Sequence, residues 1–432
     1  MTVQTIRNDV AMRAGCAYGS YTTSSADGSY TWLMDILTGL LADAEELLPG
    51  AIAMRRDLHQ HPELGNDLPR TQAKVLEALE GLGLTVTTGE TLSSVIAVLE
   101  TGRPGPTVLL RGDMDALPMP EDTTESFKSV VDGAMHACGH DSHTAMLAYA
   151  AKLLVARKDD LKGRVVFMFQ PGEEGHGGAE IMINEGVLDV AGKPDLAVAI
   201  HVTPSLPNKM IGTRGGTIMA SSDEITIDIV GRGGHASQPH VALDPIPVAC
   251  ELVMAIQSMV TRKINAFDPA VVTIAHVTAG TTSNVIPERA QIHGTIRTVS
   301  AFTRELVRNE LERLTHGIAA AHGTTAEFKV RLGYPVTVND AAVAQWSRDV
   351  ATGLLGSGFA IEMPTPVMGA EDFSYVLEQV PGAMLFLGVC PDGVNFFEAA
   401  PNHSNRMTIN ESGMVAGIAL YAGVALAKSQ EA

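Results

Sequence analysis

The segment His136-Ala137-Cys138-Gly139-His140-Asp141 places a thiol, two imidazoles and a carboxylate within six residues. The chain has only four cysteines in 432 residues, so a thiol in this company is unusual. Thiolate sulfur and neutral imidazole nitrogen are good ligands for zinc and related divalent metals. The segment therefore predicts a metal site.

The spacing of Cys138 and His140 allows both side chains to reach one ion or two close ions. If the backbone is extended here, residues two apart point to the same side, and Gly139 between them adds no bulk. In the alternative interpretation Cys138 is a small buried apolar residue and the histidines cap the helix that follows. Taken alone, the segment is consistent with both interpretations.

The adjacent acids Glu173 and Glu174 lie in a glycine-rich segment directly after the apolar run 164–170. Their side chains diverge, so the two carboxylates cannot bind the same atom in the same way. One can ligate a metal ion while the other stays free as a general base. Acids on a solvated surface are common, but the position at the end of an apolar run favours a function.

Two further histidines are candidate ligands. His201 directly follows the apolar run 196–200, where a metal ligand and a core histidine bonded to the backbone are both consistent with the pattern. His403 lies in a loop, Pro401-Asn402-His403-Ser404-Asn405, before an expected helix. Nothing in its immediate neighbourhood marks His403 as a ligand.

Asp113 and Asp115 also follow an apolar run, and their spacing lets both face one crevice. Orienting a histidine ligand is a suitable role for one of them. The segment 231–235 (GRGGH) looks like a phosphate-binding loop but lacks the full glycine pattern that opens a helix. Nucleotide binding is therefore not expected there, and His235 is the residue of interest.

The elements that must position these side chains are short apolar runs separated by helical segments. Runs such as 164–170 and 196–200 are continuously apolar, as buried strands of a mostly parallel sheet are. In open α/β sheets, ligands bind beyond the carboxyl ends of the strands. Cys138, Glu174 and His201 are therefore expected to converge although they lie far apart in the sequence.

The pattern changes at about residue 222, where a run of alternating polar and apolar residues begins. Expected strands and helices follow in the order βαββαβ, which is typical of a ferredoxin-like α+β domain. In order, the expected elements are a strand at 224–230, a helix at 247–263, strands at 270–277 and 290–297, a helix at 300–322 and a strand at 325–330.

We therefore predict an α/β fold in which a catalytic α/β domain with a mostly parallel sheet is interrupted by an inserted lid. A lid of about 110 residues is a normal size for one domain. The expected bounds are 1–33 for a flexible extension, 34–220 and 332–432 for the catalytic domain, and 221–331 for the lid.

The composition excludes several kinds of partner. The formal net charge of -19 argues against binding nucleic acid or an anionic membrane. The apolar segment 414–427 is shorter than a membrane span and is expected to be a buried helix. The four scattered cysteines indicate a reducing compartment, so the cytoplasm is expected. Residues 1–33 lack the pattern of a secretory signal, and an amphipathic helix is expected from Met34.

Eight motifs occur in order along the chain: LHQHPELG (58–65), MDALP (114–118), HACGHD (136–141), FQPGEEG (169–175), GRGGHAS (231–237), SNVIP (283–287), GTIR (294–297) and GAEDFS (369–374). Together they closely resemble the aminoacylase-like metallohydrolases, in the branch of hippurate hydrolases, N-acyl-amino-acid amidohydrolases and plant auxin-conjugate hydrolases. The similarity covers about residues 34–432. Two departures, Asn66-Asp67-Leu68 in place of an aromatic-acidic run and Gly172 in place of alanine, involve no expected ligand.

The resemblance implies two divalent metal ions, and zinc, manganese, nickel and cobalt all suit the mixed ligands. It implies that Cys138 bridges the ions and that Glu173 is the general base. It places His235 and Asn284 on the lid as residues that stabilise the reacting carbonyl, the histidine often in a partner subunit, so a homodimer through the lid is expected. The other implied ligands are His140, Glu174, His201 and His403, with His136 and Asp141 in supporting positions.

The implied reaction is hydrolysis of the amide bond of a small N-acyl amino acid, hippurate-like or N-acetylated, to a carboxylic acid and a free amino acid. A dipeptidase or aminopeptidase with the same two-metal site is the alternative among enzymes. A non-catalytic metal-binding or scaffolding protein is the alternative from another class. Loss of Cys138 or of the Glu173-Glu174 pair would indicate such a protein, and both are present.

Overall fold

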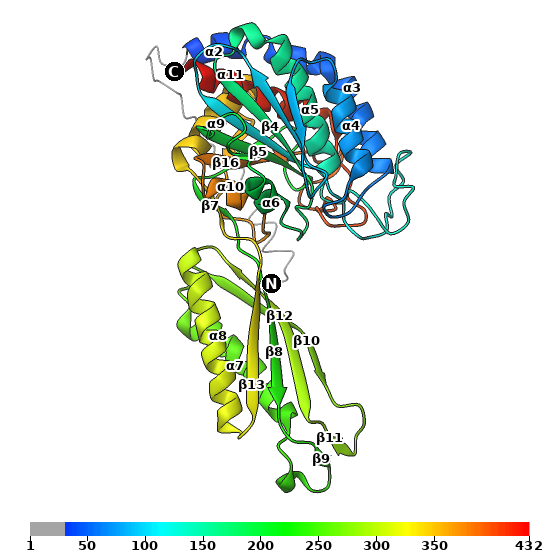
Figure 1. Ribbon diagram of the computed structural model, residues 1–432, viewed down its shortest axis with the longest axis vertical. Coiled ribbons are helices and arrows are strands. Elements are labelled where there is room, and N and C mark those ends of the chain that lie inside the picture. The colour runs from blue at the N-terminus through cyan, green and yellow to red at the C-terminus, as the bar shows by residue number, and fades with distance from the viewer. Residues whose placement is uncertain (1–30, 432) are drawn as a thin grey trace, which may run out of the picture.

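The computed structural model describes residues 31–431 and has two parts, a large body and a narrow lid that projects from it (Figure 1). The expected extension, residues 1–33, lies outside the described residues except for its last three. These three belong to helix α2 (Thr31–Leu37), in which Leu33 is buried in the core. Helical structure is therefore present before Met34, the expected start.

The body is built on one eight-stranded sheet. Across the sheet, the strands are β1 (Thr85–Thr88), β2 (Val95–Glu100), β4 (Arg164–Gln170), β3 (Thr107–Asp113), β5 (Leu196–Thr203), β16 (Gly382–Gly388), β6 (Ile211–Thr213) and β15 (Ala360–Glu362). The four central strands, β4, β3, β5 and β16, are parallel. Toward the edges, β1 with β2, β2 with β4 and β16 with β6 pair antiparallel, while β15 is parallel to β6. The predicted α/β class with a mostly parallel sheet is confirmed.

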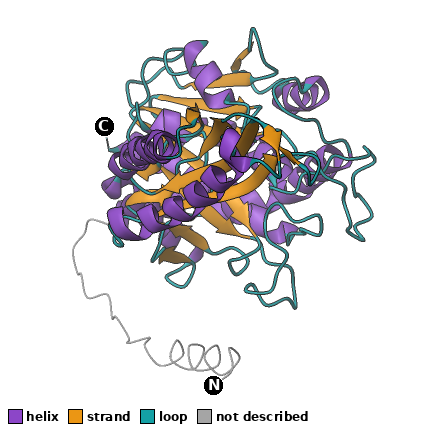
Figure 2. Ribbon diagram, turned by 90° about the horizontal axis from the view of Figure 1, so that it is seen from below, coloured by secondary structure: helices purple, strands orange, loops and turns teal. Residues whose placement is uncertain are grey.

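Helices cover both faces of this sheet (Figure 2). On β3, Val108 and Leu110 pack into the larger core, whereas Leu109 between them packs into the smaller core on the other face. Because both faces are buried, the central strands are continuously apolar rather than alternating. The larger layer contains α2, α3 (Leu40–Gln60), α4 (Pro69–Leu79), α5 (His140–Ala156), α9 (Ala341–Leu355) and α11 (Met414–Gln430), and the smaller layer contains α6 (Gly178–Asn184) and α10 (Ser374–Leu377).

Helix α11 runs through the larger core, and every residue of the predicted segment 414–427 is buried. Among the described residues, Glu411–Gln430 is the one helical stretch long and apolar enough to cross a membrane. Within this stretch, 89% of the most apolar 18 residues are buried inside the protein, as in a core helix. The prediction of a buried helix is confirmed.

The lid consists of a four-stranded antiparallel sheet and two helices in the order βαββαβ. In sequence, its elements are β8 (Asp223–Val230), α7 (Pro245–Lys263), β10 (Ala270–Ala279), β12 (Arg289–Thr298), α8 (Ala301–Ala321) and β13 (Thr325–Leu332). The strands lie in the order β10, β12, β8, β13. Ile225, Ile227 and Ile229 of β8 are buried in the lid's own core with α7 and α8, and the residues between them are less buried. This is the alternation that the sequence shows.

The lid helices begin at side-chain caps. Ser300 Oγ accepts a hydrogen bond from the Thr303 N–H at the start of α8. The Asp244 carboxylate accepts one from the Ile246 N–H at the start of α7, where Pro245 occupies the first turn. These caps explain why both helices start within two residues of their expected positions.

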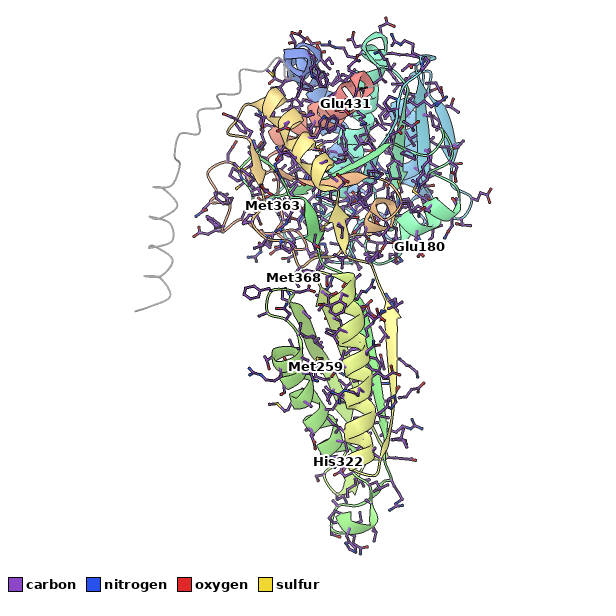
Figure 3. All side chains as sticks on the ribbon, turned by 90° about the vertical axis from the view of Figure 1, so that its left-hand side faces the viewer. Glu180, Met259, His322, Met363, Met368 and Glu431 are labelled. Atoms are coloured by element: carbon purple, nitrogen blue, oxygen red, sulfur yellow. The ribbon has the colours of Figure 1, made fainter. Side chains whose placement is uncertain are left out.

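The lid and the body meet at a narrow connection between two chain segments. Ser222, just before β8, donates its backbone N–H to the carbonyl oxygen of Tyr334, just after β13, at 3.0 Å. Figure 3 shows Met363 in the body and His322 in the lid on opposite sides of this connection. Near it, a two-stranded sheet pairs β7 (Gly216–Met219) with β14 (Thr337–Asn339). Another two-stranded sheet pairs β9 (Gly234–His235) with β11 (Val285–Ile286) at the far end of the lid (Figure 1).

Candidate metal centre

The predicted ligands gather at the carboxyl ends of the central strands. Cys138 and His140 lie at the start of α5, Glu174 follows β4, and His201 lies within β5. The ligand atoms of Cys138, His140 and His201 lie within 4.8 Å of one another, and so do those of Cys138, Glu174 and His403. Cys138 belongs to both of these groups, and a third group joins His140 to Glu173 and Glu174, so the predicted ligands form one continuous cluster.

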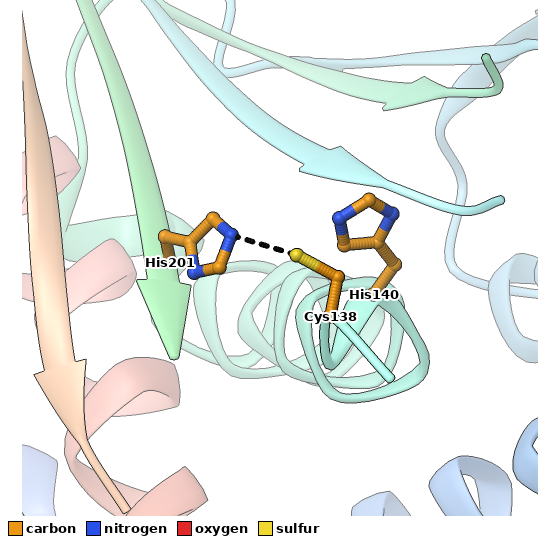
Figure 4. A group of neighbouring side chains, drawn as sticks. All are labelled: Cys138, His140 and His201. Atoms are coloured by element: carbon orange, nitrogen blue, oxygen red, sulfur yellow. Dashed lines mark hydrogen bonds between the residues drawn. The ribbon is translucent and has the colours of Figure 1, made fainter. Parts of the chain in front are cut away.

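The backbone between Cys138 and His140 is not extended, so that part of the geometric reasoning from the sequence was wrong. Gly139 has a φ of 89°, and His140 is already the first residue of α5. A Cβ atom at position 139 would lie 2.4 Å from Val202 Cγ2, so no side chain fits there. The turn nevertheless brings both ligands together, and Figure 4 shows the sulfur of Cys138 between the rings of His140 and His201.

His201 is oriented by its own strand. Its Nδ1 lies 2.7 Å from the carbonyl oxygen of Val202 and must donate a proton to it, because a carbonyl only accepts. Nε2 is therefore left with a lone pair, and it lies 3.3 Å from Cys138 Sγ. Burial and the nearby His143 hold the pKa of His201 well below its ordinary value, so the ring is neutral. A neutral, oriented imidazole is what a divalent metal requires.

His143 is close to the cluster but is not available as a ligand. Its Nε2 accepts a hydrogen bond from the Val202 N–H at 2.8 Å, and its Nδ1 donates to Asp113 at 2.5 Å. Both ring nitrogens are therefore engaged. Asp113 orients this histidine rather than a ligand, which refines its expected role.

His140 shows the need for a bound cation most clearly. Its side chain is completely buried, and neither ring nitrogen has a hydrogen-bond partner among residues 31–431. Asp115 lies 3.4 Å from Nδ1 and Glu173 lies 4.0 Å from Nε2, outside hydrogen-bonding geometry. An orphaned buried imidazole is costly unless something else satisfies it. With thiol, imidazole and carboxylate donors around it, the site fits divalent transition metals.

The Cys138 thiol is buried, and burial raises its pKa above the ordinary value. The thiol therefore carries its proton until a cation replaces it. A metal ligand must be deprotonated, so metal binding at this site releases a proton and strengthens as the pH rises.

His403 is positioned by the residue before it. Asn402 Nδ2 donates to the carbonyl oxygens of Cys138 (3.0 Å) and Val202 (3.1 Å), tying the loop to the other ligands. His403 itself has a φ of 67°, which is uncommon for a residue with a side chain. Its Nε2 lies 3.1 Å from Glu174 Oε1. Hydrogen bonds to Cys138 and Glu174 raise the pKa of His403 to about 10.

The two adjacent glutamates lie in different surroundings. Both backbone N–H groups donate to the two carboxylate oxygens of Asp115, each at 3.0 Å, which fixes the turn. The Glu173 side chain is buried, and burial together with Glu371 raises its pKa well above the ordinary value. Although burial opposes its charge, His403 and His140 lower the pKa of Glu174. Glu174 therefore suits a metal, and Glu173 suits proton transfer.

A buried ionic network supports this turn from behind. The guanidinium of Arg111 is 2% exposed and donates to Asp113, Glu371 and Asp372 at 2.5 to 3.0 Å. Asp372 also accepts hydrogen bonds from Gln170. Burial raises the pKa of Glu371 and Asp372. The two acids of the GAEDFS motif thus hold Arg111 in place behind the turn, and Glu371 also lines the cleft.

A second network supports the start of α5. Asp141 accepts hydrogen bonds from Arg55 and His59 of α3, each at 2.8 Å. Although burial opposes its charge, Arg55 and His59 hold the pKa of Asp141 below the ordinary value. His136 is buried, and burial lowers its pKa to about 4. Neither residue belongs to a ligand group, in agreement with their expected supporting positions.

His235 and Asn284 lie next to each other but far from these ligands. They are in or beside the β9–β11 pair at the far end of the lid (Figure 1). The Ser237 N–H donates to His235 Nδ1 at 3.1 Å, so the neutral ring carries its proton on Nε2. The exposed His235 is thus a hydrogen-bond donor with no access to the site of its own chain.

A cleft of about 720 Å³ opens above the metal ligands. Arg297, on β12 of the lid, lines this cleft, is half buried, and forms no ion pair among the described residues. Burial lowers its pKa, but guanidinium stays charged at neutral pH. Sequence reasoning quoted Arg297 within the GTIR motif but assigned it no role. The feature of the sequence that could have marked Arg297 is a positive charge at the end of the predicted strand 290–297.

Comparison with known proteins identifies the family to which a site of this kind belongs. Residues 109–427 match peptidase family M20/M25/M40. Thermostable carboxypeptidase 1 of Saccharolobus solfataricus is 38% identical over 91% of this chain and 99% of its own length. N-acetylcysteine deacetylase of Bacillus subtilis is 40% identical over 78% of this chain and 87% of its own.

Among solved structures, a dinuclear metal-binding peptidase of the M20 family from Bacillus subtilis superposes with a TM-score of 0.77. It is 34% identical, over 89% of this chain and 99% of that one. The chain belongs to peptidase family M20/M25/M40. The expected resemblance is confirmed, and the protein is a metal-dependent hydrolase of amide bonds.

Proposed function

We propose that this enzyme hydrolyses the amide bond of N-acyl amino acids with the help of two divalent ions. The observation that carries the proposal is the position of Arg297, which lines the same cleft as Glu173 and the metal ligands and has no ion pair among residues 31–431. A substrate with a free carboxylate beside its amide bond would place the carboxylate on Arg297 and the amide over Glu173. Arginine binds carboxylates through two parallel hydrogen bonds.

Part of the cleft is apolar and could hold the acyl group of the substrate. Apolar and sulfur-containing side chains from four parts of the body line the same cleft, and they suit an acyl chain or ring better than a charged amine. They are Leu206, Met219, Met363, Val367 and Phe386.

Glu173 would carry the proton through the reaction. Its buried carboxylate takes a proton from the attacking water and later returns it to the leaving amine. Divalent ions bound by Cys138, His140, Glu174, His201 and His403 would lower the pKa of that water and polarise the carbonyl.

A second chain would complete the site. His235 offers an N–H donor at the end of the lid, as the stabilisation of a tetrahedral oxyanion requires. Because it lies far from the ligands of its own chain, we propose that it acts in the site of a partner subunit, with Asn284 beside it. This needs a homodimer formed through the lid.

The test is a substrate panel with metal-loaded enzyme. N-acetyl and N-benzoyl amino acids should be cleaved with a higher kcat/KM than unblocked dipeptides of the same residues. Arg297→Met should raise KM for the N-acyl substrates and have little effect on a matched N-acyl amine without the carboxylate. Equal KM values in Arg297→Met and wild type would remove Arg297 from substrate binding.

A peptidase is the second candidate, because one relative is named a carboxypeptidase. A C-terminal peptide residue also presents a carboxylate beside an amide, so Arg297 would serve it equally. Faster cleavage of blocked peptides than of simple N-acyl amino acids would favour this candidate. A preference for unblocked dipeptides would instead indicate a dipeptidase.

A further inference from the structure

Tyr334 joins the lid to the turn that carries the two functional glutamates. Its main chain belongs to the base of the lid, since it lies two residues after the last residue of β13, Leu332. Its carbonyl oxygen accepts from the Ser222 N–H at 3.0 Å. Its side chain reaches into the body and lines the cleft of the metal centre.

An ion pair and several hydrogen bonds hold the base of the lid together around Tyr334. Arg304 of α8 donates to both carboxylate oxygens of Asp223, at 2.9 and 2.6 Å, and to the carbonyl oxygen of Gly333 at 2.9 Å. Asp223 is completely buried and also accepts from the Gly333 N–H at 3.2 Å. A helix and both chain crossings are thus tied together next to Tyr334, which fixes its main chain to the lid.

The hydroxyl of Tyr334 makes two hydrogen bonds, both to the glutamate turn. It donates to the carbonyl oxygen of Glu173 at 2.6 Å and accepts from the Gly177 N–H at 3.1 Å. It therefore closes the turn across residues 173–177. Burial, with Asp372 and Glu173 nearby, raises the pKa of Tyr334, so the phenol keeps the proton that it donates.

The same turn is held from the opposite side by the body. Asp115 accepts from the N–H groups of Glu173 and Glu174 and fixes where the turn begins. Tyr334 holds the carbonyl of Glu173 and the end of the turn. A rotation of the lid would thus pull on one side of Glu173 while Asp115 holds the other.

We propose that Tyr334 is a positioning residue that couples the orientation of the lid to the placement of the Glu173 carboxylate. The inference rests on the proposed function in one respect, that Glu173 is the general base. The mechanical link between lid and turn stands apart from the identity of the substrate. A change in the orientation of the lid would therefore shift the backbone of Glu173 and with it the carboxylate.

The test compares Tyr334→Phe with wild type and with Tyr375→Phe. Phenylalanine keeps the ring and its edge contact with Tyr375 (centroids 6.2 Å apart) but removes both hydrogen bonds. We expect kcat on an N-acyl amino acid to fall about 10- to 100-fold, as a misplacement of about 1 Å can cause. KM and metal content should stay within about threefold of wild type. Tyr375→Phe, whose hydroxyl does not bond to the turn among the described residues, should retain wild-type kcat.

Two further measurements separate the coupling from general damage. In a Glu173→Gln background, Tyr334→Phe should cause no further loss, because the base that it positions is absent. Hydrogen exchange at the amides of 173–178 should be faster in Tyr334→Phe than in wild type, and this readout needs no substrate. If wild type cleaved no member of the panel, the proposed function would fail while the exchange result still decided the link.

The inference is overturned by unchanged kcat in a folded, metal-loaded Tyr334→Phe protein, or by a kcat loss of equal size in the Glu173→Gln background. Unchanged exchange in the turn would also overturn it, because the hydroxyl would then not hold the turn. If Tyr334→Phe unfolds below the assay temperature, exchange measured at low temperature on the remaining folded protein decides the same question.

Discussion

At the scale of single residues, neighbouring residues of the same type have different surroundings and therefore different roles. Glu173 and Glu174 are adjacent, yet burial raises the pKa of one while nearby imidazoles lower the pKa of the other. His140 and His143 lie one helical turn apart, yet only His140 has ring nitrogens without partners among the described residues. Roles at this site are therefore set by partners, not by residue type.

The first prediction separates the two glutamates. Glu173→Gln should keep its bound metal but lose kcat by about 10²- to 10⁴-fold, the usual contribution of a general base. Glu174→Gln should instead weaken metal binding. Metal content by elemental analysis and kcat are measured on both variants. A Glu173→Gln enzyme with near wild-type kcat would remove Glu173 from the role of base.

The second prediction concerns the two departures from the family pattern, which touch each other in the structure. A Cβ atom at Gly172 would lie 1.8 Å from Asn66 Oδ1. Gly172→Ala should therefore destabilise the protein by more than Gly175→Ala, whose added Cβ has nothing within 4 Å. Both glycines have positive φ, so the cost of about 1 to 2 kcal/mol for that conformation is common to both.

Adding Asn66→Ala to Gly172→Ala should recover the excess loss, because it removes the atom that clashes. Unfolding free energies of the two single variants and the double variant give this coupling, expected at about 0.5 kcal/mol or more. Additive losses would show that the two departures are independent.

Residue types and spacing marked Cys138, His140, the Glu173-Glu174 pair and His201 as candidate ligands, and the family resemblance assigned the role of each. Arg297 and Tyr334 were not predicted, since an arginine or tyrosine on a strand end gains its role only from what the fold places opposite. His403 was assigned from resemblance alone. The contacts of Asn402 that place it join segments 200 and more residues apart.

At the scale of elements, long periodic segments were predicted well. Strand β4 has the predicted bounds. β5 extends to Thr203, so His201 lies inside the strand rather than after it. Short strands such as β6 and β15, with three residues each, were not predicted, because pairing within the sheet rather than local sequence makes them strands.

The third prediction concerns the junction of α3 with the loop that holds Glu121. Burial disfavours the charged form of Glu121. Hydrogen bonds from His59, Thr123 and the Ser129 N–H nevertheless lower the pKa of Glu121 to about 2. A carboxylate with a depressed pKa stabilises the fold above its ordinary value of 4.5 and loses that contribution as the pH falls toward 2. Glu121→Gln should thus lower the free energy of unfolding at pH 7, by about 1 to 3 kcal/mol.

The difference between Glu121→Gln and wild type should shrink between pH 4.5 and pH 2. The contribution of its hydrogen-bond partner His59 to stability depends on pH in the opposite direction. The pKa of His59 is raised, so its contribution is complete below about 6.5 and declines as the pH rises through the raised value. Urea unfolding over this pH range measures both trends. Glu77→Gln, on the surface, is the control, and an equally large loss there would contradict the explanation.

At the scale of the whole molecule, the lid places two functional features at opposite ends of one domain. Arg297 lies near the connection to the body and faces the cleft of its own chain. His235 lies at the far end, where one chain alone cannot use it (Figure 1). A long lid with both features is therefore consistent with sites shared between two chains.

The fourth prediction tests this sharing by mixing two inactive variants. Glu173→Gln lacks the base, and His235→Ala lacks the donor. If His235 acts in the partner's site, each hybrid dimer has one intact site, so an equal mixture should regain about a quarter of wild-type activity. A control mixture of Glu173→Gln with the Glu173→Gln/His235→Ala double variant should regain nothing. Failure of the first mixture to exceed the control would contradict a shared site, as would unchanged kcat/KM in His235→Ala alone.

The central claim is that two cations, bridged by Cys138, support amide hydrolysis in this cleft. The most direct measurement is a titration of metal-depleted protein with zinc, manganese, nickel or cobalt, following bound metal and turnover of an N-acyl amino acid together. We expect turnover to reach its plateau at two ions per chain, and the Cys138→Ala protein to retain neither full stoichiometry nor activity. Full turnover in metal-depleted protein, or a plateau at one ion, would contradict the claim.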